Sequence, residues 1–117
     1  MEIAFDERDA SCAEVAVAPY LQNTLGALQG GVVATLIEAT AERFAASALG
    51  GPVRVRGIEL HYLKLGRRGP VRARAEALTR TAAGLLVRVA LDDRGQGSDC
   101  LTVATVWMER ADAQLNR

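Results

Sequence analysis

The chain has 117 residues, half of them apolar and 24% charged, so a single domain can bury a sizeable core without disulfide bonds. Fourteen basic and fourteen acidic side chains leave no net charge, which excludes a general attraction to nucleic acid or anionic membranes. The N-terminal residues lack the basic start and apolar core of a signal peptide, and no apolar run approaches the roughly 20 residues of a membrane span. We therefore expect one cytoplasmic domain over residues 1–117, with neither a nucleic-acid nor a membrane partner.

Residue types that bind metals are sparse. Cys12 and Cys100 lie far apart without the spacing of a zinc site, and His61 is the only histidine. Two reduced thiols are the simplest interpretation of the cysteines. We expect no metal and no cofactor, and His61 facing either solvent or a subunit interface.

The first predicted elements are a strand and a helix. Residues 12–17 alternate weakly between apolar and polar side chains, which predicts a strand before Pro19. From Gly30 to about Leu49, apolar residues recur every three or four positions, and Gly50-Gly51-Pro52 ends this amphipathic helix. Only three of its residues are charged, so we expect a sheet to cover it on most sides. They are Glu38, Glu42 and Arg43.

The remainder of the chain has the two-residue period of strands. Residues 71–77 and 85–91 alternate, whereas 101–108 are apolar on both faces, which suggests that a second subunit covers that strand. A shift of the apolar phase at Gly57 predicts a β-bulge. The connections at 66–70, 80–84 and 92–99 are short enough for antiparallel hairpins. The predicted fold class is α+β: a strand, one long helix and four more strands, giving an antiparallel sheet of about five.

Gly30 and Gly31 open the predicted helix and form a candidate oxyanion hole. The N–H groups of a first helical turn have no acceptor within the helix, and the helix dipole favours negative charge there. Glycine also lets a substrate oxygen approach the backbone closely. From spacing alone, a plain turn or helix start explains the pair equally well.

Glu38, about two turns further along, is the candidate general base. We expect it beside Ala34, Ala41 and Ala45, whose small side chains leave room for a substrate or water, with partial burial raising its pKa. A glutamate on a helix rim is also commonly just solvated. Because eight residues span about 12 Å of helix, Gly30 and Glu38 of one chain cannot contact the same carbonyl carbon. If both act, the site combines two subunits.

The segment from Asn23 to Glu38 resembles the N-x-x-G-x-x-[HQ]-G-G-x-x-x-x-L-x-[DE] segment of PaaI-like hotdog thioesterases. The resemblance extends to Glu109 and implies the hotdog fold, in which a sheet wraps one central helix. It implies Glu38 as nucleophile or general base, as in the 4-hydroxybenzoyl-CoA thioesterases that use glutamate. It further implies an oxyanion N–H from Gly30 of the facing subunit and positioning of the thioester by Asn23. Members of this family form homodimers and usually homotetramers.

One position departs from the common family pattern. Gln29 stands where most members have histidine, and glutamine exchanges hydrogen bonds but carries no proton at neutral pH. A role in orienting substrate or water remains. Glu42, one turn after Glu38, either shares the site or is simply exposed.

Further candidates for substrate contact lie at the helix start and in the strands. Lys64 falls near the family's polar position after the first long strand. Arg67 and Arg68 resemble a basic patch for CoA phosphates, although a solvated turn is an equally good interpretation. The predicted substrate-binding set is Gln29, Gly31, Ala34, Glu42, Leu60, Tyr62, Lys64, Arg67 and Arg68.

The predicted function is hydrolysis of acyl-CoA or acyl-carrier-protein thioesters to a free acid and a thiol, with coenzyme A present only as part of the substrate. The alternative is a hotdog protein that binds acyl groups without turnover, as the glutamine at position 29 would allow. A hydratase or dehydratase ranks last, since that branch pairs an acid with a histidine on the helix. No histidine lies between Gly30 and Leu49.

Overall fold

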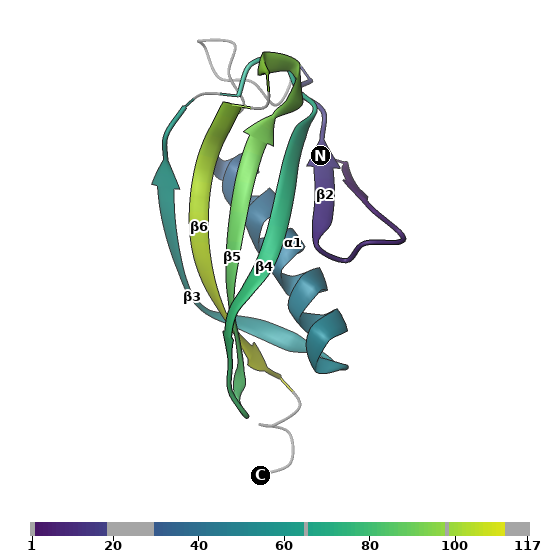
Figure 1. The fold of residues 1–117 in the computed structure, drawn as a ribbon, viewed down its shortest axis with the longest axis vertical. Helices are drawn as coiled ribbons and strands as arrows, with labels where there is room; N and C mark the ends of the chain where they lie inside the picture. The colour runs from purple at the N-terminus through teal and green to yellow at the C-terminus, as the bar shows by residue number, and fades with distance from the viewer. Residues whose placement is uncertain (1, 19–29, 65, 98, 112–117) are drawn as a thin grey trace.

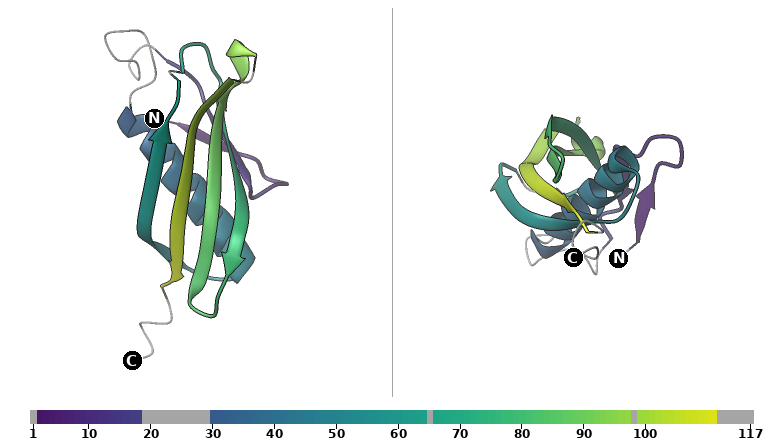
Figure 2. Two further views of the ribbon diagram at one scale, coloured as in Figure 1. Left: turned by 60° about the vertical axis from the view of Figure 1, so that its left-hand side comes forward. Right: turned by 90° about the horizontal axis from the view of Figure 1, so that it is seen from below.

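A single helix lies across one face of a six-stranded antiparallel sheet in the computed structural model, which describes residues 2–18, 30–64, 66–97 and 99–111 (Figure 1). Seen along its length, the sheet curves around the helix (Figure 2). The helix is α1 (Gly30–Leu49), and a short 3-10 turn, η2 (Arg94–Gln96), precedes the last strand. The strands are β1 (Ile3–Phe5), β2 (Cys12–Val15), β3 (Val53–Tyr62), β4 (Val71–Arg80), β5 (Gly84–Asp93) and β6 (Asp99–Arg110). The predicted α+β class with one wrapped helix is confirmed.

The order of strands across the sheet is β1-β2-β4-β5-β6-β3, which corrects one prediction. Strands β4, β5 and β6 form the expected hairpins, but β3 pairs with β6 and not with β4, so the 66–70 connection is no hairpin. Strand β6 lies between β5 and β3, but neighbouring strands cover the edges of a strand and not its faces. Its inner face is fully buried, while its outer residues Val103, Thr105 and Trp107 are half-buried.

The core lies between α1 and the concave face of the sheet. Helix residues Val33, Leu36 and Ile37 are buried there, and the Thr40 hydroxyl is satisfied by donating to the Leu36 carbonyl oxygen at 2.7 Å. The strands contribute every second residue, as the two-residue period predicted, except that Ala77 at the end of the predicted alternation is exposed. These are Val71, Ala73, Ala75, Leu85, Val87, Val89, Leu91, Ala104, Val106 and Met108.

Two predicted backbone features are confirmed. The register of β3 against β6 shifts between Val55 and Gly57, which is the expected bulge. The helix ends at Gly50, whose φ of 73° is a conformation that favours glycine, and its N–H donates to the Ala46 carbonyl at 2.9 Å.

The sixth strand, β1, was not predicted. Among the described strands it pairs with β2 alone, and it is held by Arg43 of the helix. The Arg43 guanidinium donates to the carbonyl oxygens of Asp6, Asp9 and Cys12 and lies 5.2 Å from the centroid of the Phe5 ring. A charge that the sequence left without a role therefore fastens the N-terminal strands to the helix.

Candidate functional site

The start of α1 is open and lies against the end of β3. Gly30 and Gly31 are both exposed, and the Tyr62 hydroxyl donates to the Gly30 carbonyl oxygen at 3.2 Å. A Cβ added at Gly31 would meet nothing within 4 Å, and one at Gly30 would meet the Tyr62 side chain at ordinary contact distance, with the hydroxyl nearest at 3.7 Å. The described residues therefore leave the first helical turn accessible to a ligand.

Glu38 is exposed on the face of the helix that also carries Gly31, Thr35 and Glu42. These residues follow one another at helical spacing and form a polar stripe turned away from the core. The described residues therefore leave this side of the helix uncovered.

The expected surroundings of Glu38 need a correction. Ala41 and Ala45 are fully buried against the sheet, because they lie on the core side of the helix; Ala34 is only half-buried. The room in front of Glu38 is thus open surface on the stripe side and not a niche between alanines.

Three other predicted residues lie in or just after β3. Tyr62 meets the helix start, and Leu60, two positions earlier on β3, is half-buried. Lys64 is exposed just beyond β3, where its backbone N–H donates to the Leu101 carbonyl oxygen at 3.1 Å. Asn23 and Gln29 lie outside the described residues.

Arg67 and Arg68 are exposed in the turn between β3 and β4, and their backbone is bound by a residue that the sequence analysis did not select. One carboxylate oxygen of Asp93 accepts from the N–H groups of Arg67 and Arg68, at 2.9 and 3.0 Å. The other oxygen accepts from Gly69 at 2.7 Å and from Gly95 at 3.0 Å. The Asp93 side chain thus joins the turn to the end of β5.

The electrostatics of Asp93 follow from these contacts. The residue is fully buried, and burial by itself raises the pKa of its carboxyl group. The four backbone hydrogen bonds together outweigh burial and hold that pKa below its ordinary value. The signal in the sequence was an aspartate followed by Arg-Gly-Gln-Gly, which is typical of a side chain that caps its own turn.

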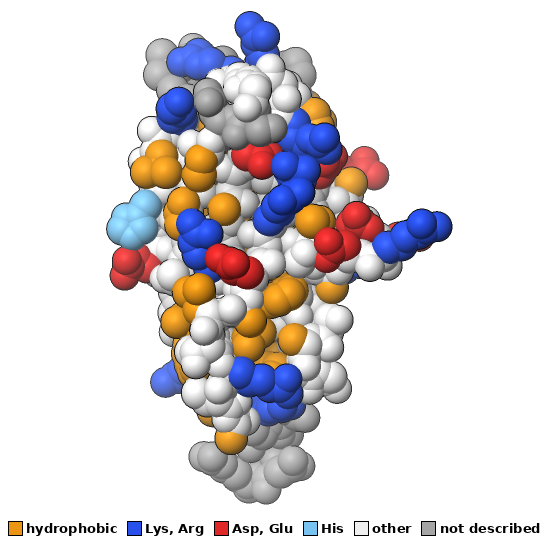
Figure 3. Space-filling model, in the orientation of Figure 1, with side chains coloured by type: hydrophobic (Ala, Val, Ile, Leu, Met, Phe, Trp, Pro, Cys, Tyr) orange, Lys and Arg blue, Asp and Glu red, His pale blue; other side chains and the backbone are white. Residues whose placement is uncertain are grey.

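The outer face of the sheet combines charge pairs with apolar surface (Figure 3). Arg72 pairs with Asp92 at 3.0 Å, and Arg88 with Glu76 at 3.1 Å. Two hollows of about 420 and 460 Å³ lie where β2 and β4 meet, and both are lined by Asp9, Cys12 and Arg74. Neither Gly30 nor Glu38 lines them.

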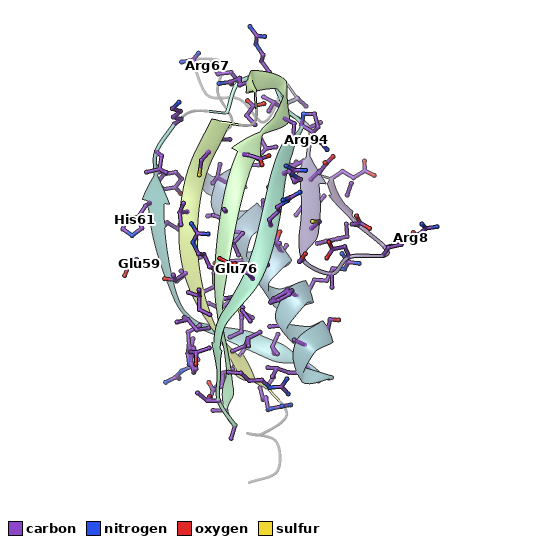
Figure 4. The ribbon with its side chains drawn as sticks, in the orientation of Figure 1. Arg8, Glu59, His61, Arg67, Glu76 and Arg94 are labelled. Carbon is purple, nitrogen blue, oxygen red and sulfur yellow. The ribbon has the colours of Figure 1, made fainter. Side chains whose placement is uncertain are left out.

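The histidine and the two cysteines are the remaining residues of chemical interest. His61 is exposed at the edge of the sheet, where its Nε2 lies 2.9 Å from Oε1 of Glu59 (Figure 4). Cys12 and Cys100 are free thiols. Within the described ranges, no three histidine, cysteine, aspartate or glutamate residues come together as metal ligands. The one helix of the described structure is not long and apolar enough to cross a membrane.

Comparison with known proteins identifies the family of the chain that carries this open helix start and polar stripe. The family model described as the thioesterase superfamily matches residues 25–100. The chain belongs to the thioesterase superfamily. The match includes the helix and most of the sheet, and it confirms the predicted enzyme class, a thioester hydrolase, at the level of the family.

Solved structures agree on the fold. A thioesterase from Haemophilus influenzae superposes with a TM-score of 0.81 at 20% identity, covering 92% of this chain and 76% of that one. The PaaI protein of the Escherichia coli phenylacetic acid degradation operon gives 0.79 at 16% identity, covering 92% and 82%. A Bacillus halodurans protein solved with CoA gives 0.76 at 19% identity, covering 84% of this chain, which spans 65% of the length of that protein. The predicted likeness to PaaI-like hotdog proteins is confirmed. No curated protein sequence is significantly similar to this chain.

Proposed function

We propose that residues 1–117 form one thioesterase domain that hydrolyses acyl-CoA to a free acid and the CoA thiol. The observation that carries the proposal is the open start of α1, two turns before an exposed glutamate, in a member of the thioesterase superfamily. The presence of CoA in the Bacillus halodurans relative supports CoA as the thiol part of the substrate. Coenzyme A enters as substrate, and the proposed reaction uses no other cofactor.

The enzyme is proposed to act as a homodimer. Strand β3 is the last strand of the sheet, so one of its backbone edges has no neighbouring strand within the described chain. Ile58, Tyr62 and Leu63, in and just after this strand, are 37%, 56% and 58% exposed, which is much apolar surface for one sheet edge. A second copy that pairs along β3 would cover this surface. A homotetramer would further cover the half-buried outer face of β6.

In the proposed mechanism, the carbonyl oxygen of the thioester accepts a hydrogen bond from the Gly30 N–H, which stabilises the negative charge of the tetrahedral intermediate. Glu38 of the partner subunit either removes a proton from an attacking water or attacks the carbonyl carbon itself. In both routes the C–S bond breaks and the CoA thiolate leaves and is protonated. The direct route forms an anhydride between Glu38 and the acyl group, which water then hydrolyses. When water attacks the Glu38 carbonyl carbon, a single turnover in oxygen-18 water leaves the label in the Glu38 carboxylate.

The rest of the predicted site binds substrate. Apolar lining for the acyl group is proposed from Ala34, Leu60 and Tyr62, with Asn23, Gln29, Gly31 and Glu42 around the thioester. Lys64, Arg67 and Arg68 are proposed to meet the phosphates of CoA, since guanidinium groups bind phosphate through paired hydrogen bonds. Two free thiols fit a reducing compartment, and we place the reaction in the cytoplasm.

The test is a thiol-release assay over aliphatic and aryl CoA esters with Glu38→Gln and, as a matched control on the outer face of the sheet, Glu76→Gln. Loss of the base should lower kcat by about 100-fold or more, whereas the control should change it only a few-fold. Both side chains are exposed, so neither change should alter folding. Equal activity in Glu38→Gln and wild type would refute the catalytic assignment.

Gln29 in place of histidine favours a second candidate, a protein that binds acyl-CoA without hydrolysing it. Saturable binding of a non-hydrolysable thioether analogue of acyl-CoA, with no thiol released from any ester by the wild type, would establish this function instead.

A further inference from the structure

The turn that carries Arg67 and Arg68 is fastened to the loop between β5 and β6 at several points besides the Asp93 carboxylate. The N–H of Arg67 also donates to the Gln96 side-chain oxygen at 2.8 Å, and the N–H of Arg94 donates to the Pro70 carbonyl at 3.0 Å. A Cβ added at Gly95 would lie 2.6 Å from both the Arg68 Cβ and the Gly69 carbonyl oxygen. The two loops are therefore in direct backbone contact.

A buried carboxylate is a costly way to hold a simple connection between strands. Removing a carboxylate from water is unfavourable unless hydrogen bonds replace the lost hydration, and here four backbone N–H groups do so. Three of these donors belong to consecutive residues, 67 to 69. The effect is to fix the backbone from which two adjacent exposed arginines project.

The fixed turn lies at the end of the molecule where the helix begins. Arg67 lies beyond the upper end of the sheet, and α1 begins in the same half of the molecule (Figures 1 and 4). Tyr62 touches Gly30, and the five residues from Tyr62 to Arg67 reach at most about 18 Å. That reach is comparable to the extended pantetheine arm, which joins the thioester of an acyl-CoA to its phosphates.

From this placement we infer that Asp93 is a positioning residue for the CoA moiety. It acts through the Arg67–Arg68 turn and thereby sets the affinity for the phosphate-bearing part of the substrate, without touching the thioester. The inference rests on the proposed acyl-CoA thioesterase function and adds to it a residue that discriminates CoA esters from esters of short thiols.

The test compares two substrates with the same acyl group, an acyl-CoA and the N-acetylcysteamine thioester, which lacks phosphates. In Asp93→Asn one carboxylate oxygen is replaced by an NH2 group that faces backbone N–H donors, so the turn loosens. The KM for acyl-CoA should rise about tenfold, as expected when a charge-assisted phosphate contact is lost. The kcat for both substrates and the kcat/KM for the short thioester should stay within about twofold of wild type, because the thioester site is intact.

Two companion variants separate positioning from general destabilisation. Gly95→Ala pushes the same turn away by a methyl group and should reproduce the selective rise in KM. Asp92→Asn, the matched control, removes a neighbouring carboxylate that pairs with Arg72 on the outer face, and it should leave the ratio of the two substrates unchanged. In the Arg67→Ala/Arg68→Ala background, Asp93→Asn should raise the KM no further, since its effect passes through those arginines.

Each outcome bears on one claim. If the wild type hydrolyses neither thioester, the proposed function fails. If the wild type is active and Asp93→Asn weakens both substrates equally, or if its effect adds fully to that of the double arginine variant, the positioning role is overturned. Should Asp93→Asn not fold, Gly95→Ala decides, because it displaces the turn and keeps both arginines: an unchanged KM for acyl-CoA overturns the inference, and a selective rise supports it.

Discussion

Replacing Gly30 by proline removes one backbone N–H from the start of α1 while leaving the helix intact. The first residue of a helix donates no hydrogen bond within it, and proline is favoured at that position because its φ is already helical. The added Cβ would lie 3.7 Å from the Tyr62 hydroxyl, an ordinary contact, and the Gly30 carbonyl that accepts from Tyr62 is retained. The free energy of unfolding should therefore change by less than about 1 kcal/mol, a shift in Tm of roughly 4 °C.

The effect on catalysis should be far larger. Loss of a single oxyanion donor lowers kcat by about 100- to 1000-fold, or about 3–4 kcal/mol of transition-state stabilisation. Gly30→Ala is the matched control, because it adds a Cβ at the same place but keeps the N–H. Thiol release from an acyl-CoA measures both variants, with thermal unfolding run alongside. Proline and alanine variants of equal activity would refute the assignment of the Gly30 N–H to the oxyanion hole.

Three further predictions concern stability and access. Gly31→Ala should raise the free energy of unfolding by up to about 1 kcal/mol in urea titrations, because alanine is the better helix former and its Cβ meets nothing. Its kcat/KM should fall, because the added methyl group blocks a substrate oxygen from the backbone at this position. Full activity would argue against such an approach of the substrate to Gly31. Gly84→Ala should destabilise by roughly 1–3 kcal/mol or more, since its Cβ would lie 2.0 Å from the Met108 carbonyl oxygen, and an unchanged urea midpoint would contradict that packing. The pKa of Asp93 is lower in the folded protein than its ordinary value of 3.8, so its contribution to stability should be complete near neutral pH and decline as the pH falls below about 4. In urea titrations from pH 7 to 3, the free energy of unfolding of the wild type should converge on that of Asp93→Asn. A constant difference in free energy between the two proteins would count against an ionised Asp93.

The sequence predicted the elements of the fold well, because these are set by local periodicity. The helix runs from Gly30 to Leu49 as predicted, since its apolar spacing is clear and Gly50 stops it. The pairing of β3 with β6 was beyond prediction, because alternation identifies a strand but not its neighbour. Strand β1, with three residues, is too short to show a period.

In the candidate site too, the residues that a local motif contains were predicted and those that depend on the tertiary fold were not. Gly30 and Glu38 stand out because a short motif on one helix contains both, and their catalytic roles remain predictions. Asp93 could not be found in this way. All four groups that it binds are backbone N–H groups, and three of them lie 24 to 26 residues away in the chain. Every residue except proline has such a group, so the amino-acid sequence does not show which ones Asp93 binds. Nor could spacing show that Ala41 and Ala45 face the core, since that depends on which side of the helix the sheet covers.

The hold of Asp93 on the turn between β3 and β4 has a consequence for how specificity can change. The four hydrogen bonds of the Asp93 carboxylate that join the described loops all come from main-chain N–H groups, so they do not depend on which side chains stand at positions 67 and 68. We expect these backbone hydrogen bonds to persist when the two arginines are replaced by neutral or acidic residues. Under the role in CoA binding proposed for this turn, changing these two side chains would change which thiol carrier is recognised, without a redesign of the fold.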